Sequence, residues 1–466
     1  MKSLKAQALA GVKWTTLSAV VCAVLQIVKM AILARLIARE DFGLFATIAV
    51  VLGFADFFVE AGLGSAVIHK QDATKEDLAS AYTINIVLGW LIFIVLYYAS
   101  WPVAAFYDES RLVSLLHLAT LIFLIQPLGR QYNALLRRDL QFDILAKLDI
   151  FAASVGFVVS LLFAWHGLGV KALIYSQITV AFVRTVILML IGCKKYGFNL
   201  GFSANSARFF FRFSMFQICE NSVNYFNTQL DAILIGKLLG QETLGIFYMA
   251  KQIAFRPIQI INPIITTISL PVFAKVQNDT ERLKRGFLQV VHSLAIILFG
   301  LFTVMAGFAK EITSIFLGQN WSAAATILSI LSFYTMLRAI GNPVGSLLIA
   351  KGRVDLGFYW NLSLLAYTPV IVIYTSKWGV LGISWGLLAA MAGLLIPGWY
   401  FLVHRLCGAS FVEYFGKLFI TASMAFLCFG PLLFMTHLSL KLITVFIGLF
   451  FYLWYNYQPI MALKRT

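Results

Sequence analysis

The sequence consists almost entirely of apolar runs of about 20 residues or more, with short polar gaps between them. Because lipid offers the backbone no hydrogen-bonding partner, only helices and closed barrels can span a bilayer. The lengths of these runs predict an all-α integral membrane protein with about 14 transmembrane helices, and twelve is the alternative count. The expected spans are 12–36, 42–66, 79–104, 112–135, 144–165, 168–192, 213–238, 243–274, 286–309, 323–350, 354–376, 379–403, 411–436 and 440–457.

The composition and the placement of charge support a membrane protein and argue against binding to nucleic acid. The chain is 61% hydrophobic and 12% charged, with a mean hydropathy of +0.87, which excludes a soluble globular domain. Its 36 Lys and Arg residues lie mostly in the gaps, 22 on the side of the N-terminus and eight on the other. This bias predicts that both termini are cytoplasmic. The first run is too long for a signal-peptide core, so we expect an uncleaved span.

The sequence lacks the short motifs that are typical of metal sites and of ATPases. The five cysteines are scattered without metal-ligand spacing, and no phosphate-binding loop of the ATPase type occurs. We therefore expect no metal, no cofactor, no catalytic residues and no built-in ATPase.

One apolar run, 213–247, carries a polar stripe on a single helical face. Its members recur at steps of three and four: Gln217, Glu220, Asn221, Asn224, Thr228 and Asp231. The same pattern occurs 202 positions earlier: Thr15, Ser18, Ala19, Cys22, Gln26 and Lys29. A polar face on a membrane helix turns towards a bundle interior or a water-filled cavity, because an unpaired polar group in lipid costs several kcal/mol. Both helices are therefore predicted to line a cavity.

The repeat extends beyond these two stripes. Leu36, Glu40, Gly43 and Phe45 match Leu238, Glu242, Gly245 and Phe247, and Gly129, Leu135, Leu136 and Asp143 match Gly341, Leu347, Leu348 and Asp355. With six spans in each copy, both copies have the same topology, related by an axis along the membrane normal. We predict an N-terminal six-helix lobe in 1–200 and its repeat in 201–405. Residues 406–466 would add two transmembrane helices and a short cytoplasmic tail.

Charged residues inside the expected spans mark the candidate site. The cations are Lys29, Arg130, Arg184, Lys251, Arg256 and Arg338, and the anions are Asp56, Glu60, Asp149, Glu220 and Asp231. Each costs about 2.5–3.5 kcal/mol or more at the centre of a lipid-facing helix, so each must be paired, hydrated or bound. We interpret the cations as a cavity for an anionic headgroup, since arginine donates two parallel hydrogen bonds to phosphate.

The alternative for the cations is structural ion pairing or snorkelling. Asp56, Glu60, Glu220 and Asp231 are either ion-coupling sites or partners of those cations. The polar lining of the cavity would come from Thr15, Ser18, Gln26, Gln217, Asn221, Asn224 and Thr228.

The run from Asn227 to Ala250, NTQLDAILIGKLLGQETLGIFYMA, resembles the Wzx-type oligosaccharide flippases, and in particular the colanic-acid and teichuronic-acid exporters. The segments 270–279, 40–45 and 133–142 fit the same family pattern. The resemblance implies a fold like that of MATE transporters, with two lobes around a central cavity. It implies export of undecaprenyl-pyrophosphate-linked oligosaccharide across the bacterial inner membrane for surface polysaccharide synthesis. Membrane lipids, a polysaccharide polymerase and the chain-length machinery would be partners.

The sequence leaves three other functions open. A cation-coupled drug antiporter of the same fold is disfavoured by the net positive charge within the spans. A polymerase or ligase acting on lipid-linked sugars would need a long outer loop, and none is expected here. A lipid scaffold without transport would not need a charged cavity. Of the four functions, an oligosaccharide flippase that works by alternating access fits the residues best.

Overall fold

The computed structural model describes the backbone of residues 4–60 and 74–463, and the side chains of 11–59, 74–203, 222–263 and 265–456. Every element in these ranges is helical, which confirms the predicted all-α class. Twelve stretches of the described chain are long and apolar enough to cross a membrane, against the expected number of about 14. Two of the twelve are 54 residues long, Ser222–Lys275 and Val354–Cys407, and each contains an interruption.

The chain divides into two compact units, Met1–Gly245 and Ile246–Thr466, and each is described by itself. The division falls inside α9 (Ala204–Lys275), just after Gly240, where the backbone leaves the helical region with φ 82° and ψ 173°. Only glycine adopts this conformation without strain. The two units are defined by how compactly the chain packs. They do not test the lobe boundaries expected from the repeat, which remain a prediction.

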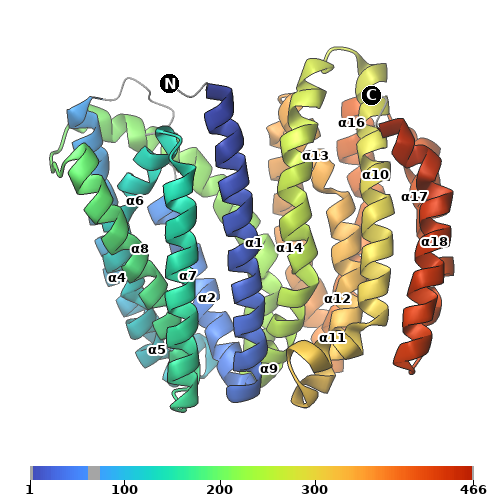
Figure 1. The fold of residues 1–466 in the computed structure, drawn as a ribbon, viewed down its shortest axis with the longest axis horizontal. Coiled ribbons are helices and arrows are strands. Elements are labelled where there is room, and N and C mark those ends of the chain that lie inside the picture. Colours follow the sequence, from blue (N-terminus) through green and yellow to red (C-terminus); the bar gives the residue numbers. More distant parts are fainter. Residues whose placement is uncertain (1–3, 61–73, 464–466) are drawn as a thin grey trace. The chain divides into compact units, whose positions relative to one another are not determined.

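The first unit is a bundle in which long helices pack pairwise. Helix α1 lies against α7, α7 against α8, α8 against α6 and α6 against α4 (Figure 1). Its helices are α1 (Leu4–Leu36), α2 (Arg39–Glu60), α4 (Lys75–Tyr107), α5 (Arg111–Thr120), α6 (Ile122–Arg138), α7 (Phe142–Trp165), α8 (Val170–Tyr196) and the first part of α9.

Hydrogen bonds from α4 to backbone carbonyl groups of α6 join the two helices around Pro127. Pro127 has no backbone N–H, so the carbonyl that it frees from the α6 ladder is that of Phe123, one turn earlier, and α4 binds two other carbonyls of this segment. Asn85 of α4 donates to the Pro127 carbonyl at 3.2 Å, and Tyr82 donates to that of Leu128 at 3.0 Å. Gly89 of α4 leaves room for the proline ring, which lies 2.1 Å from where a Cβ would stand. These contacts fix the part of α6 that carries Arg130.

The second unit repeats the pairing of the first. Helix α10 lies against α12, α12 against α15 and α14 against α15, as α4, α6, α8 and α7 do in the first unit. This correspondence supports the internal repeat inferred from the sequence. The elements after α9 are α10 (Thr280–Gly307), α11 (Ala309–Phe316), η1 (Gln319–Trp321), α12 (Ser322–Ile340), α13 (Asn342–Ala350), α14 (Val354–Thr375), η2 (Ser376–Trp378), α15 (Gly379–Gly398), η3 (Trp399–His404), α16 (Arg405–Cys407), α17 (Phe411–Phe429), η4 (Gly430–Leu433) and α18 (Leu438–Leu463).

The last two long helices, α17 and α18, are attached to α10 and α11. Tyr452 of α18 donates to the Ile296 carbonyl at 2.8 Å. Lys441 is 4% exposed and binds the Glu311 carboxylate at 2.8 Å and the Gly307 carbonyl at 2.7 Å. Because a buried charge is tolerated only when it is paired and hydrogen-bonded, this contact holds the start of α18 firmly in place.

Candidate functional site

The polar stripe of α1 divides between the bundle interior and the surface of the first unit. Lys29 donates to the Ser176 hydroxyl of α8 at 3.4 Å, and Ser176 in turn donates to the Gly156 carbonyl of α7 at 2.7 Å. Ser18 is buried, whereas Thr15 and Gln26 are exposed. Of these four members of the stripe, Ser18 and Lys29 face inward, whereas Thr15 and Gln26 are exposed to a ligand or to lipid.

The two predicted site arginines of the first unit are paired with carboxylates on neighbouring helices. Arg130 of α6 binds Asp56 of α2 and also donates to Gln126 at 2.9 Å. Arg184 of α8 lies 3.2 Å from Asp149 of α7. Pairing removes most of the cost of keeping these charges between helices. For Asp56 and Asp149 this geometry favours a role as cation partners.

The stripe on α9 is described only from residue 222 onward. Asn224 is exposed, and Thr228 donates to the Tyr225 carbonyl of its own helix at 2.8 Å. Asp231 is 7% exposed and accepts the Ala232 backbone N–H at 2.7 Å. The predicted positions whose side chains lie outside the described residues are Gln217, Glu220 and Asn221 in α9, and Glu60 in α2.

The remaining three predicted cations lie in the second unit, and two of them, Lys251 and Arg338, approach the same aromatic ring. Lys251 has its Nζ 5.7 Å from the centre of the Phe255 ring, one turn further along α9. The guanidinium carbon of Arg338, on α12, lies 5.6 Å from the same ring. Arg338 also donates to the Tyr334 hydroxyl at 3.2 Å, and Arg256 donates to the Gln259 amide oxygen at 3.2 Å. We call Lys251, Phe255, Arg256, Tyr334 and Arg338 the cationic cluster.

Arg256 and Arg338 contact uncharged groups, whereas Arg130 and Arg184 of the first unit contact carboxylates. Among the residues whose side chains are described, neither Arg256 nor Arg338 forms an ion pair with a carboxylate. The only acidic residues between 246 and 463 are Asp279, Glu281, Glu311, Asp355 and Glu413, which stand at or near helix ends. All five members of the cluster are half-buried. The two arginines of the cluster are thus partly exposed, and the groups shown to contact them are uncharged.

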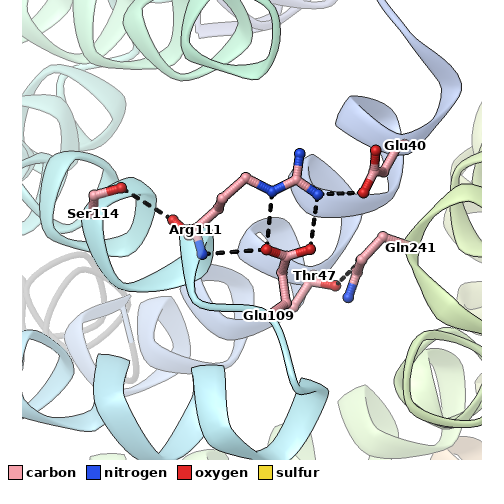
Figure 2. Close-up of polar contacts among 6 residues, drawn as sticks. All are labelled: Glu40, Thr47, Glu109, Arg111, Ser114 and Gln241. Atoms are coloured by element: carbon pink, nitrogen blue, oxygen red, sulfur yellow. Dashed lines mark hydrogen bonds and ion pairs between the residues drawn. The ribbon is translucent and has the colours of Figure 1, made fainter.

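Polar contacts that were not predicted from the sequence join α2 to the start of α5 and to α9 (Figure 2). Arg111 donates to both carboxylate oxygens of Glu109, at 2.9 and 2.8 Å, and also binds Glu40 of α2. Thr47 of α2 donates to the Gln241 amide oxygen of α9 at 3.0 Å. The short spacing of Glu109 and Arg111 was a visible signal, but their contact with Glu40 depends on the fold.

Two matched glycines of the repeat make a reciprocal contact in the first unit. A Cβ on Gly43 would lie 1.8 Å from the Gln241 carbonyl oxygen, and one on Gly245 would lie 2.0 Å from that of Arg39. The offset of 202 relates Gly43 to Gly245 and also Arg39 to Gln241. The two copies of the motif therefore cross with their backbones in direct contact, which requires a glycine at each position.

The Glu109–Arg111 contact predicts a dependence of stability on pH. Hydrogen bonds from Arg111 hold the pKa of Glu109 below its ordinary value. A lowered pKa contributes stability above the ordinary value of about 4.3, and this contribution disappears as the pH falls through the folded-state pKa. Thermal melts of the purified protein should show Glu109→Gln destabilised at pH 7, with the difference shrinking below about pH 4. A difference that stays constant down to pH 3 would contradict this.

Comparison with known proteins places the chain among membrane proteins of polysaccharide synthesis. A family model described as "Polysaccharide biosynthesis protein" matches residues 32–326. The teichuronic acid biosynthesis protein TuaB of Bacillus subtilis is 32% identical over 447 residues, covering 95% of this chain and 92% of that protein. The lipopolysaccharide biosynthesis protein WzxC of Escherichia coli is 28% identical, covering 90% and 85%.

The fold also has a counterpart among solved structures. The lipid II flippase MurJ, in an inward closed conformation, superimposes with a TM-score of 0.75 at 13% identity, covering 96% of this chain and 99% of that one. At 13% identity, this similarity is evidence for a shared fold and not for a shared function.

Proposed function

Because the chain belongs to the polysaccharide biosynthesis protein family, we propose that it is a flippase for lipid-linked oligosaccharides. Its substrate would be a sugar repeat unit on undecaprenyl pyrophosphate, moved from the cytoplasmic to the outer leaflet of the bacterial inner membrane. This is transport and not catalysis. The observation that carries the proposal is the pair of arginines in the cationic cluster, Arg256 and Arg338, neither of which forms an ion pair with a described carboxylate.

The mechanism divides the work between two kinds of residue. Arg256, Arg338 and Lys251 neutralise the pyrophosphate, because guanidinium and ammonium groups form short, charge-assisted hydrogen bonds with phosphate oxygens. Exposed polar groups of the α1 and α9 stripes, such as Gln26 and Asn224, would contact the sugars. The polyprenyl tail stays in lipid, where its burial is favourable.

Alternating access would move the headgroup, with the two units opening in turn towards each side of the membrane. Since the chain has no phosphate-binding loop, an ion gradient, the membrane potential or consumption of the product outside would drive transport. Both termini would be cytoplasmic, as the distribution of Lys and Arg predicts. A polymerase and the chain-length machinery would take up the exported units.

A drug antiporter of the same fold is the main alternative, and the relatives argue against it. TuaB and WzxC are named for teichuronic acid and lipopolysaccharide biosynthesis, and both match most of this chain. A cationic drug would also be repelled by the cationic cluster.

Reconstitution tests the proposal. Purified protein in liposomes should make a labelled undecaprenyl-pyrophosphate-linked sugar, placed in the inner leaflet, accessible to an impermeant reagent outside. In cells, removal of the protein should make the lipid-linked sugar accumulate on the cytoplasmic face. Liposomes with and without protein that expose the label at the same rate would overturn the proposal. Uptake of a cationic dye, without sugar movement, would favour the antiporter.

A further inference from the structure

The part of α9 that follows Gly240 carries a further polar stripe, which lies in the second unit. Its members recur at steps of three and four residues and so share one helical face: Tyr248, Gln252, Arg256 and Gln259. The positions that the repeat matches to them, 202 residues earlier, are all apolar: Ala46, Val50, Phe54 and Phe57. The repeated fold therefore does not require polar residues on this face, and they call for another explanation.

The contact with Arg256 fixes the direction in which the Gln259 carboxamide points. Arg256 donates to the Gln259 oxygen at 3.2 Å, and because arginine only donates hydrogen bonds, the NH₂ group turns away from it. This NH₂ group has no acceptor among the described residues, and Gln259 is exposed within a membrane-length apolar helix. Since an unsatisfied polar group in lipid costs several kcal/mol, the exposed amide needs a polar ligand or water.

Two prolines add hydrogen-bond acceptors to the same stretch of α9. Pro257 and Pro263 have no backbone N–H, so the carbonyls of Ile253 and Gln259, one turn earlier, lose their helical donors. The side-chain oxygen of Asn262 is buried without a partner among the described residues. Buried polar atoms are nearly always satisfied, so an unpaired one marks a place for a polar ligand or a water. The segment 246–278 also contains no acidic residue.

We infer that this face of α9 is the subsite for the sugar bonded to the pyrophosphate, with Gln259 donating to a sugar hydroxyl while Arg256 binds the pyrophosphate. Hydroxyl groups both donate and accept, which suits a face that combines an amide N–H with unpaired carbonyls. Gln259 stands three residues after Arg256, about 4.5 Å further along the helix axis, so one headgroup is able to reach both. The inference rests on the proposed function and names the residue that recognises the sugar.

Binding to the purified full-length protein tests the role of Gln259. The probes are farnesyl pyrophosphate and its glucose-linked and galactose-linked forms, and calorimetry gives their dissociation constants. Wild-type protein should bind at least one sugar-linked probe more tightly than farnesyl pyrophosphate. Gln259→Met keeps the length of the side chain but has no N–H. It should weaken that sugar-linked probe by about three- to tenfold and leave farnesyl pyrophosphate within about twofold of wild type.

A second variant and a matched control separate the two parts of the site. Gln259→Glu places a carboxylate beside Arg256, where it competes with phosphate for the guanidinium group, so it should weaken all three probes. Gln319 is also an exposed glutamine, but it lies outside α9, in η1, and donates to the Ser314 hydroxyl at 3.0 Å. Gln319→Met should bind all three probes like wild type.

The outcomes distinguish this inference from the proposed function. Loss of the sugar preference in Gln259→Met, with normal binding of farnesyl pyrophosphate, supports it. A wild-type protein that binds all three probes equally, or an unchanged sugar preference in Gln259→Met, overturns the sugar subsite and leaves the pyrophosphate site intact. Equal weakening of all three probes by Gln259→Met also overturns it, because Gln259 would then act only through Arg256. If Arg256→Ala and Arg338→Ala both bind farnesyl pyrophosphate like wild type, the proposed binding site is overturned, and the inference with it.

Discussion

Arg338→Ala is expected to lower the transport of lipid-linked sugar by at least about tenfold, with Arg256→Ala having an effect of the same order. A hydrogen bond to a charged group contributes roughly 1.5–3 kcal/mol, which corresponds to about ten- to a hundredfold in binding. Both variants should reach the membrane in normal amounts, since neither arginine has a described carboxylate partner that the change would strand. Proteoliposome transport and the membrane level of the protein are the measurements.

Two further variants sharpen this result. Arg338→Lys keeps the charge but loses the planar fork that donates to Tyr334 and stacks near Phe255, so transport should be intermediate. Arg353→Ala is the matched control, because Arg353 is exposed, pairs with Asp355 at 3.0 Å and lies away from the cluster. Wild-type transport from both Arg338→Ala and Arg256→Ala would remove the cationic cluster from the substrate path.

The six predicted cations show which features of the candidate site could be predicted from the sequence. Hydropathy was enough to place all six inside helices, because an apolar run leaves no other position for them. Their partners could not be predicted, since Arg130 and Asp56 are 74 residues apart and meet only when α6 packs near α2. Only the structure therefore shows that Arg130 is paired with a carboxylate and that Arg338 has no described carboxylate partner.

Helix α9 shows the same limit: the sequence predicts where a helix is interrupted, but not which residues of other helices it contacts. The repeat predicts that the segment around Gly240 ends one span and begins another, and the backbone of α9 leaves the helical region at Gly240. Periodicity did not reveal that Tyr225 would donate to the Val50 carbonyl at 2.6 Å, which joins the first part of α9 to α2. A polar face specifies that a helix needs a wet or polar neighbour, but the identity of that neighbour depends on packing.

The reciprocal glycine crossing gives the second large expected effect, this time on stability. Gly43→Ala and Gly245→Ala should each lower the melting temperature of the purified protein by about 5 °C or more. Each new Cβ would fall on a backbone carbonyl oxygen, at 1.8 Å from Gln241 and 2.0 Å from Arg39. A flexible side chain could move aside, but here the backbones of α2 and α9 must separate, which would also break the Thr47–Gln241 hydrogen bond.

Gly286→Ala provides the comparison, because no atom lies within 4 Å of its Cβ position in α10. There, alanine should be neutral or stabilising, since glycine inside a helix costs about 0.5–1 kcal/mol relative to alanine. If Gly43→Ala and Gly286→Ala melt alike, the close crossing of α2 and α9 does not exist in the folded protein. If Gly43→Ala is destabilised and Gly245→Ala is not, the contact exists but is not reciprocal. Loss of stability in both would show that the two copies of the motif meet through the same backbone surface, as their matched positions in the repeat require.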